Sequence, residues 1–293
     1  MKCLIVGCGY VGLPLGAELV RQGHEVFGLR RSASAENELK AAGIKPLAGD
    51  VTKPETLAKL PRKFDWVVNC VAAGGGDENY RQVYLEGNRN LISWLADSPP
   101  KKFVYTSSTS VYGQNDGSVV TEQSPAEPAE ETSKVLVQTE KLLLAAVAEC
   151  KFPAVILRVA GIYGPERGHW FKQLLRGEAR IEGDGSRFLN MIHRDDVAGC
   201  IITALKNGRA GEIYNAVDDE PVTQLNFFEW LAAELKRPLP PKIPVSAEIS
   251  RKRGTTNKRV SNAKLRKELE YEFQFPDFRA GYATEIARLG VAR

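Results

Sequence analysis

The sequence predicts a doubly wound α/β fold, in which helices cover both faces of a parallel sheet, together with a smaller C-terminal α/β cap. Two observations carry this prediction. Short apolar runs rich in Val and Ile alternate with helix-length amphipathic stretches, which is the pattern of a parallel sheet with crossover helices. A glycine-rich loop follows the first apolar run, and the alternation weakens after Gly164-Pro165.

Seven apolar runs are predicted to form the strands of the sheet. They are Lys2–Gly7, Glu25–Arg30, Ile44–Leu47, Trp66–Val71, Phe103–Ser107, Ala154–Val159 and Ile213–Ala216. The amphipathic stretches between them predict helices near residues 11–22, 35–42, 54–60, 78–97, 131–150 and 195–207. Each strand is thus followed by a connection long enough to cross over the sheet.

The chain is expected to fold as two domains. Ile213–Ala216 still has the pattern of a core strand, so residues 1–164 and 191–218 are assigned to the sheet domain. Beyond Asp218 the chain becomes helical. Residues 165–190 and 219–293 are therefore assigned to a substrate-binding cap.

The composition is that of a soluble globular protein, with 43% hydrophobic and 26% charged residues. Met1-Lys2 runs directly into a short apolar strand, so we expect no targeting segment, no membrane partner and a cytoplasmic location. The five cysteines show no CxxC spacing and the three histidines lie far apart. We expect reduced cysteines and no metal site.

The net charge of +4 is too small to indicate nucleic acid as a partner, but it is unevenly distributed. Residues 236–267 contain eleven Lys and Arg and one acid, Glu248. Either this is a solvated surface, or it provides a field that attracts an anionic substrate.

The loop after the first strand contains Gly7-x-Gly9-x-x-Gly12 between a strand and a helix. In this context the spacing predicts a dinucleotide site of the Rossmann type. Gly7 permits a tight turn, Gly9 lets the backbone approach a pyrophosphate, and Gly12 lets the helix pack closely on the sheet. We include the loop residues Tyr10 and Val11 in the site; the alternative is a glycine-rich turn without a ligand.

The second strand ends in Leu29-Arg30-Arg31-Ser32, where an NAD site usually has an acid that accepts from the ribose 2′-hydroxyl. Arg30 and Arg31 would instead pair with the 2′-phosphate of NADP. The sequence therefore favours NADP over NAD. The alternative is that both arginines point into solvent and Ser32 serves NAD.

Further stretches follow in order: "LAGDVTKP" at 47–54, "FVYTSSTSVYG" at 103–113, "LRVAGIYGPERG" at 157–168, "NMIHRDDVAGCI" at 190–201 and "GEIYNAVDDEPVT" at 211–223. With the glycine loop, this succession resembles the extended short-chain dehydrogenase/reductase superfamily, in its NAD-dependent epimerase/dehydratase group, over nearly the whole chain. The resemblance is specific for fold and cofactor and much less specific for the reaction. It implies that Asp50 and Val51 contact the adenine and that Cys70, Val71 and Ala72 line the cofactor.

The same resemblance implies a catalytic site. Ser108 matches the catalytic Ser/Thr of the superfamily, although a strand-end residue that satisfies local backbone is the alternative. In these proteins a Tyr-x-x-x-Lys pair opens the next helix, and the tyrosine acts as general acid/base. Lys134 occupies the place of the lysine, as a ligand of the cofactor ribose, but Glu130 stands where the tyrosine is expected.

Three functions follow from the absent tyrosine. The first is an NAD(P)-dependent enzyme, of epimerase/dehydratase or reductase type, that acts on a small anionic or carbonyl-bearing substrate. In it the proton is supplied by Glu130, Tyr112, Tyr163 or an incoming side chain. The second is a non-catalytic NAD(P)-binding sensor or scaffold protein. The third, a conventional sugar-nucleotide epimerase, is the least favoured.

Polar residues beside the family's substrate region are candidate substrate contacts. They are Arg167 and His169 in "GPERGHW" and Arg187 in "GDGSRF", with plain surface residues as the alternative. Relatives in the superfamily often pair through the helices that correspond to 78–97 and 131–150. A homodimer is therefore expected as a possible assembly.

Overall fold

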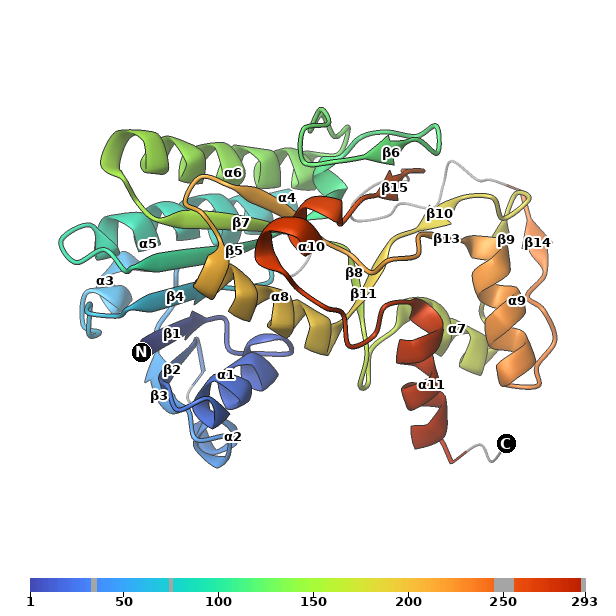
Figure 1. Cartoon of the computed structure of the whole chain (residues 1–293), viewed down its shortest axis with the longest axis horizontal. Coiled ribbons are helices and arrows are strands. Elements are labelled where there is room, and N and C mark those ends of the chain that lie inside the picture. Colours follow the sequence, from blue (N-terminus) through green and yellow to red (C-terminus); the bar gives the residue numbers. More distant parts are fainter. Residues whose placement is uncertain (33–35, 74–75, 245–255, 291–293) are drawn as a thin grey trace.

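The computed structural model describes residues 1–32, 36–73, 76–244 and 256–290. Its centre is a seven-stranded sheet, in which every pair of neighbouring strands is parallel (Figure 1). The strand order is β12-β7-β5-β4-β1-β2-β3. The strands are β1 (Lys2–Val6), β2 (Glu25–Arg30), β3 (Lys45–Ala48), β4 (Trp66–Asn69), β5 (Lys102–Ser108), β7 (Ala154–Val159) and β12 (Ile213–Ala216). The predicted doubly wound parallel sheet is confirmed.

The strands form where the sequence has unbroken apolar runs, because a parallel sheet is covered on both faces. All residues of β4 and β7 are buried, and β1 is buried after its first residue. Ile5 in β1 lies opposite Gly28 of β2 on one side and Val68 of β4 on the other.

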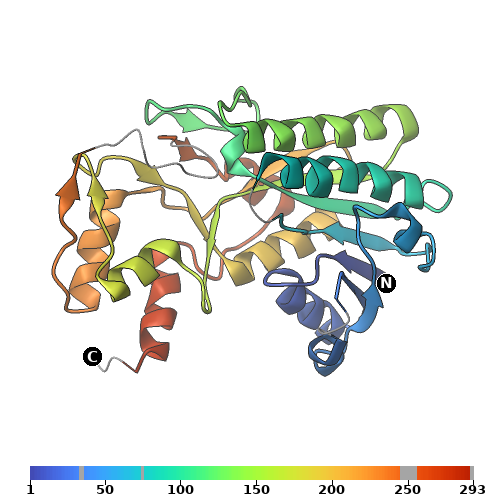
Figure 2. The same cartoon turned by 180° about the vertical axis from the view of Figure 1, so that it is seen from behind.

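Helices cover both faces of the sheet (Figures 1 and 2). One layer contains α4, η2, α5 and α6, and the other contains α1 and α8. The helices of the domain are α1 (Gly12–Arg21), α2 (Glu36–Ala41), α3 (Pro54–Leu57), α4 (Asp77–Tyr80), η2 (Arg81–Glu86), α5 (Gly87–Leu95), α6 (Glu131–Cys150) and α8 (Arg194–Asn207). The helix predicted at 78–97 corresponds to α4, η2 and α5, where η2 is π-helical.

The strand order reverses at β1, which places a crevice at the carboxyl ends of the strands there. From β1 the chain adds β2 and β3 on one side, and then β4, β5, β7 and β12 on the other. In doubly wound sheets, ligands bind outside the carboxyl ends of the strands at such a switch point.

The cap surrounds a second, separate cluster of buried residues that is rich in aromatic side chains, among them Phe227, Phe228 and Phe278. Its helices are α7 (His169–Arg176), α9 (Gln224–Glu234) and α11 (Phe278–Arg288), which lie together away from the large sheet in Figure 1. Short strand pairs connect them: β8 (Gly161–Tyr163) with β11 (Met191–His193), β9 (Ile181–Glu182) with β14 (Lys242–Ile243), and β10 (Phe188–Leu189) with β13 (Val222–Thr223).

One segment that was assigned to the cap packs against the sheet domain instead. β15 (Arg259–Val260) pairs with β6 (Val119–Val120), and α10 (Ala263–Leu269) packs on α8 and β12. Leu265 and Leu269, one helical turn apart, are fully buried in the cluster of the sheet domain. The domain division drawn at residue 219 therefore differs from the structure here, because these two leucines form a stripe that needs the α8–β12 surface as its cover.

Two features are absent from the described ranges: a membrane-spanning helix and a cluster of metal-binding side chains. No helix there has the length and apolar character needed to cross a membrane. No group of three or more His, Cys, Asp or Glu side chains in those ranges could hold a metal ion. The five cysteines are free thiols, and only Cys150 is exposed.

Candidate functional site

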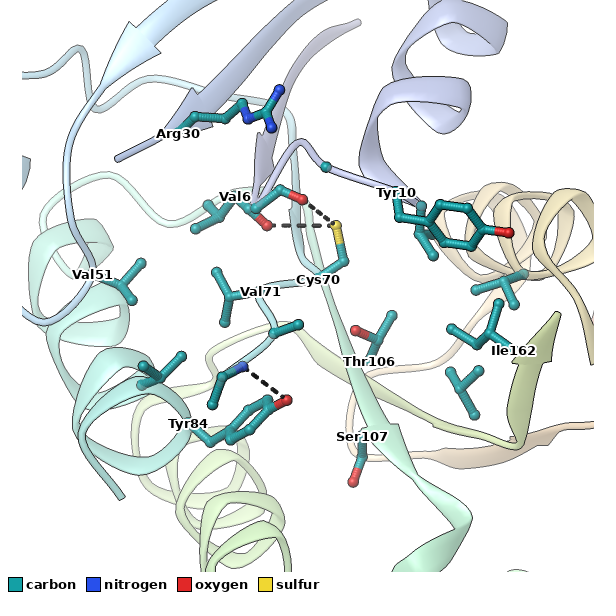
Figure 3. A pocket seen from close by; sticks show the side chains of 18 of the residues that line it. Val6, Tyr10, Arg30, Val51, Cys70, Val71, Tyr84, Thr106, Ser107 and Ile162 are labelled. Carbon is teal, nitrogen blue, oxygen red and sulfur yellow. Dashed lines mark hydrogen bonds between the residues drawn. The ribbon is translucent and has the colours of Figure 1, made fainter. Parts of the chain in front are cut away.

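A pocket of about 760 Å³ lies at the carboxyl ends of β1, β2, β4 and β5. We call it the dinucleotide pocket. It is lined by eleven of the thirteen residues predicted to bind the cofactor, which are Gly7, Gly9, Tyr10, Val11, Arg30, Arg31, Asp50, Val51, Cys70, Val71 and Ala72. Figure 3 shows Cys70 and Val71 between Arg30 at one end and Thr106 and Ser107 at the other. The sequence motifs thus converge on one cavity, at the place where the strand order reverses.

The three glycines of the loop have different roles. Gly7 has φ +85°, and a Cβ there would lie 2.6 Å from the backbone N of Val71, so the loop touches the end of β4. A Cβ on Gly9 would meet nothing closer than the Gly7 carbonyl oxygen at 4.0 Å, so the space beside Gly9 belongs to the pocket. A Cβ on Gly12 would lie 2.8 Å from that same oxygen, which makes Gly12 a packing residue that does not line the pocket.

Two arginines stand at the end of β2, where the ribose 2′ position was predicted. Both Arg30 and Arg31 line the pocket. Arg30 Nη1 lies 2.5 Å from Glu38 Oε2 on α2, and both side chains are partly exposed. The pair partly neutralises Arg30, while Arg31 is exposed at the rim.

The loop after β3 is fixed by its own hydrogen bonds. Asp50 Oδ1 accepts from the backbone N–H of Thr52 at 2.9 Å and from its hydroxyl at 2.8 Å. The Val51 carbonyl accepts from the Asn90 side chain at 2.8 Å. These contacts hold Asp50 and Val51 at the pocket wall.

The thiol of Cys70 points back into the protein at the end of β4. It donates to the carbonyl oxygens of Gly7 at 3.3 Å and Val6 at 3.5 Å (Figure 3). Burial raises the pKa of the Cys70 thiol well above its usual value, so the thiol stays protonated and unreactive. Nearby, the Ala73 N–H donates to the Tyr84 hydroxyl at 3.3 Å.

A second pocket of about 280 Å³ adjoins the first and contains Ser108. We call it the substrate pocket. Both pockets are lined by Ala160, Gly161, Ile162, Gly168 and His169. Ser108 is buried, and its hydroxyl oxygen accepts from the Ser110 N–H at 3.2 Å at the start of the short 3₁₀ turn η3 (Thr109–Val111). The serine therefore caps this turn and also lines the pocket.

Two cationic side chains line the substrate pocket. Lys258 is 4% exposed, and its Nζ donates to the Tyr112 carbonyl at 2.8 Å and to the Thr256 hydroxyl at 2.6 Å. Burial lowers the pKa of Lys258 to about 8. The Nε and Nη2 atoms of Arg187 are buried without a hydrogen-bond partner among the described residues, and burial lowers its pKa. No Asp or Glu among the described residues lines this pocket.

Lys134 and Glu130 line neither of the two pockets. The Lys134 ammonium lies 2.6 Å from Glu131 Oε1, and its side chain is 46% exposed. On the same helix, the buried Glu140 contacts the sheet. Lys134 lies six residues before Glu140, which places its side chain about 120° around the helix axis from the face of Glu140. Glu130 is exposed at the start of α6, where its carbonyl accepts from the Lys134 N–H. Lys134 lines neither pocket in this structure, and its role as a ligand of the cofactor ribose stays a prediction.

The other proton-donor candidates, Tyr112 and Tyr163, are buried, and the hydroxyl of each donates a hydrogen bond within the protein. The Tyr112 hydroxyl donates to Asn215 Oδ1 at 2.8 Å and does not line either pocket. Tyr163 lines the substrate pocket, but its hydroxyl donates to the Asp277 carbonyl at 3.3 Å. Burial raises the pKa of both phenols. Both phenols therefore stay protonated near neutral pH.

A buried ion pair lies behind Ser107, a lining residue of the dinucleotide pocket. Arg158 on β7 and Glu140 on α6 form a bidentate salt bridge. Arg158 Nη2 donates to Glu140 Oε2 at 2.7 Å, and Arg158 Nε donates to Glu140 Oε1 at 3.1 Å. Glu140 Oε1 also accepts from the Ser107 hydroxyl at 2.6 Å. Since Ser107 lines the dinucleotide pocket, the pair fixes the end of β5 from behind.

The three candidate substrate contacts are divided between the pockets. Arg167 lines the dinucleotide pocket, Arg187 lines the substrate pocket, and His169 lines both. His169 is exposed at the start of α7, with its ring 4.9 Å from that of Trp170.

Sequence reasoning missed Lys258, which it treated as one cation of a basic stretch. A local signal exists: Lys258 and Val260 are buried and Arg259 is exposed, which is the alternation of a strand. A lysine at an inward position of such a pattern indicates a buried amine.

The parallel sheet and the pocket at its switch point define an α/β protein of the Rossmann type. The chain belongs to the NAD dependent epimerase/dehydratase family, whose model matches residues 3–216. Protein YeeZ of Escherichia coli K12 is 29% identical over 289 residues, covering 94% of this chain and 97% of YeeZ.

Solved structures agree with this family. A Methylobacillus flagellatus structure assigned provisionally to the NAD-dependent epimerases/dehydratases is 33% identical, with a TM-score of 0.79 and coverage of 99% and 98% of the two chains. A double mutant of the dTDP-glucose 4,6-dehydratase DesIV from Streptomyces venezuelae, with NAD and DAU bound, is 23% identical with a TM-score of 0.83. It covers 100% of this chain and 98% of DesIV, and it shows the shared fold.

Proposed function

We propose that this protein is an NADP-dependent enzyme that acts on a small anionic or carbonyl-bearing substrate, with acid/base chemistry that does not use a Tyr-Lys pair. The observation that carries the proposal is the junction of the two pockets. The predicted cofactor residues line one pocket and Ser108 lines the other, and both share Ala160, Gly161 and Ile162 as a wall. A cofactor in the first pocket would have a substrate in the second as its neighbour.

The residues present fit a dinucleotide. The open space beside Gly9 admits a pyrophosphate against the backbone, and the N-terminus of α1 favours its negative charge. Asp50 and Val51 would hold the adenine, and Cys70 would line the cofactor from the end of β4. When bound, NADP supplies a hydride donor or acceptor.

Ser108 and Lys258 are the polar groups that would act on the substrate. The Ser108 hydroxyl can hydrogen-bond to a substrate oxygen. Since the pKa of Lys258 is about 8, its amine can hold or release a proton near neutral pH, as general acid/base catalysis requires. Arg187 offers two donors to an anionic substituent.

NADP is proposed over NAD because of Arg30 and Arg31. A charge-assisted contact with the 2′-phosphate stabilises the complex by about 1.5–3 kcal/mol, which corresponds to roughly a 10- to 100-fold preference. The carboxylate of Glu38 competes for Arg30 and reduces this preference.

The test measures binding and turnover separately. Calorimetry gives the dissociation constants of NADP and NAD, and NADPH absorbance follows turnover with a panel of sugar nucleotides and small carbonyl compounds. Ser108→Ala should retain NADP binding and lose turnover by roughly 10²-fold or more. Ser98→Ala, outside both pockets, is the control and should change neither.

A second function is favoured by a specific observation: the start of α6 presents neither a tyrosine nor a lysine to the pockets. On that basis the protein would be a non-catalytic NAD(P)-binding sensor or scaffold. Tight NADP binding with no turnover across the panel, in the wild type as in Ser108→Ala, would favour this function over the enzyme.

A further inference from the structure

The turn after β8 has an unusually constrained backbone. Gly164 has φ +135°, Glu166 +59° and Gly168 +140°. Gly164 and Arg167 exchange two backbone hydrogen bonds, of 3.3 and 2.9 Å, across the turn. A left-handed conformation at a non-glycine residue such as Glu166 is costly, so the surrounding structure must enforce it.

Packing on both sides of the turn provides that enforcement. A Cβ on Gly164 would lie 2.9 Å from His193 Nε2, and a Cβ on Gly168 would lie 3.0 Å from the Tyr282 hydroxyl. Both neighbours are buried aromatic residues. The turn is therefore seated in one position, and the backbone of Arg167 is fixed with it.

The same turn is connected to the glycine loop of the other domain through Tyr10. The Tyr10 hydroxyl donates to the Pro165 carbonyl at 3.0 Å. The guanidinium carbon of Arg167 lies 4.3 Å from the centre of the Tyr10 ring, within the range of a cation–π contact. Burial raises the pKa of Tyr10 to about 12, so its hydroxyl keeps the proton that it donates.

Arg167 is positioned with its charge available. It lines the dinucleotide pocket together with Gly7 and Gly9, whose loop is the place of the pyrophosphate. Among the described residues, no carboxylate lies within 4.0 Å of its guanidinium and no side-chain hydrogen bond uses its donors. A guanidinium held beside an anion site, with its fork of donors unused, is suited to a pyrophosphate.

We propose that Arg167 is a pyrophosphate ligand of the dinucleotide, held over the glycine loop by its contact with Tyr10. The inference rests on the proposed dinucleotide function of the pocket. It replaces the role of substrate contact that the sequence suggested for Arg167, and it makes the turn at 164–168 the part of the cap that senses the cofactor.

The test compares ligands with and without a pyrophosphate. Arg167→Ala should weaken NADP and ADP-ribose binding by about tenfold or more. It should leave the binding of 2′-AMP unchanged, because 2′-AMP has no pyrophosphate. Arg194→Ala is the matched control, since Arg194 also lies near the Tyr10 ring, at 5.4 Å, but does not line the pocket. Tyr10→Phe, which removes the hydroxyl bond to Pro165 and keeps the ring, should weaken NADP less than Arg167→Ala does.

Calorimetry and a thermal melt of each variant decide between the outcomes. Unchanged NADP and ADP-ribose affinity in a folded Arg167→Ala protein overturns the inference and leaves the proposed function standing. An equal loss for 2′-AMP also overturns it, because the effect would then be a general one on the pocket. A wild-type protein that binds neither NADP, NAD nor ADP-ribose overturns the proposed function itself. Should Arg167→Ala be unstable, Arg167→Gln, which keeps the length and removes the charge, is measured in its place.

Discussion

Replacing Glu140 by glutamine should destabilise the fold strongly, because it leaves a charge buried without its partner. The side chains of Arg158 and Glu140 are only 5% and 3% exposed. Glu140 accepts from Arg158 Nη2 at 2.7 Å and from the Ser107 hydroxyl at 2.6 Å. Glutamine keeps the shape and can still accept from Ser107, but it removes the negative charge.

The expected loss of unfolding free energy depends on whether one partner of the buried ion pair is removed or both partners are replaced. Breaking it by Glu140→Gln or Arg158→Met alone should cost about 3–5 kcal/mol, whereas replacing both partners by apolar residues of similar volume is often neutral or stabilising. Glu140→Leu combined with Arg158→Met should therefore cost much less than either single change. Since total stabilities are about 5–15 kcal/mol, the single variants remain measurable.

Urea unfolding, followed by circular dichroism, measures these free energies. The control is the exposed pair of Lys134 with Glu131, 2.6 Å long, for which Glu131→Gln should cost at most about 1 kcal/mol. A cost below about 1 kcal/mol for Glu140→Gln would refute the reasoning. So would a Glu140→Leu/Arg158→Met variant whose cost equals the sum of the costs of Glu140→Leu alone and Arg158→Met alone.

Three further results are expected. The pKa of Lys258 is lowered to about 8 in the folded state and is about 10.4 in the unfolded chain. Because the unfolded chain binds more protons between these two pH values, folding stability should rise with pH across that window, by up to roughly 3 kcal/mol. Urea unfolding of Lys258→Met should show that this rise is lost. Glu38→Gln should increase the preference for NADP over NAD by releasing Arg30, and calorimetry that shows no change would argue against Arg30 as a 2′-phosphate ligand. Arg30→Ala with Arg31→Ala should selectively weaken NADP and reduce the salt dependence of its binding; equal wild-type affinities for NAD and NADP at low salt would contradict the cofactor assignment.

The elements of the sheet were predictable because burial on both faces leaves a strong local signal. Each predicted strand ends within about two residues of the observed one, and α6 spans Glu131–Cys150 as expected. The residues that line the dinucleotide pocket were predictable from the positions of the strands. Once the strands are parallel, the residues just after β1 and β4, such as Gly7 and Cys70, must meet at one edge.

The assignments of Lys134 and Glu130 depend on the rotation of α6, which the spacing of a sequence motif does not fix. Lys134 was chosen by its spacing in a motif whose tyrosine is missing, so one residue alone fixed the alignment. Glu140 shows the true orientation of α6, because it reaches Ser107 and Arg158 in the sheet. Thr132 and Leu136, eight and four residues before it, are buried on that face, and Lys134 is not.

The hydrogen-bond partner of Lys258 could not be predicted from local sequence, because it is distant along the chain. It donates to the carbonyl of Tyr112, 146 residues earlier, and the pairing of β15 with β6 helps to bring the two together. That pairing also moves this segment from the cap to the sheet domain. The basic composition around Lys258 therefore concealed a buried amine among cations that are mostly exposed.

Lys258 lies in the pocket where a proton-transferring group is needed once the tyrosine of the Tyr-Lys pair is absent. A proton-transferring group must reach the substrate beside Ser108, and α6 presents none to that pocket. Lys258 lines the same pocket as Ser108, on a segment that enters from the side of β6. Burial lowers its pKa towards neutrality, with no carboxylate partner among the described residues to oppose the shift. A charged buried amine destabilises the fold below that pKa. An enzyme in which this amine transfers the proton should therefore have a turnover whose pH dependence changes near 8, and one in which Lys258 is only structural should not.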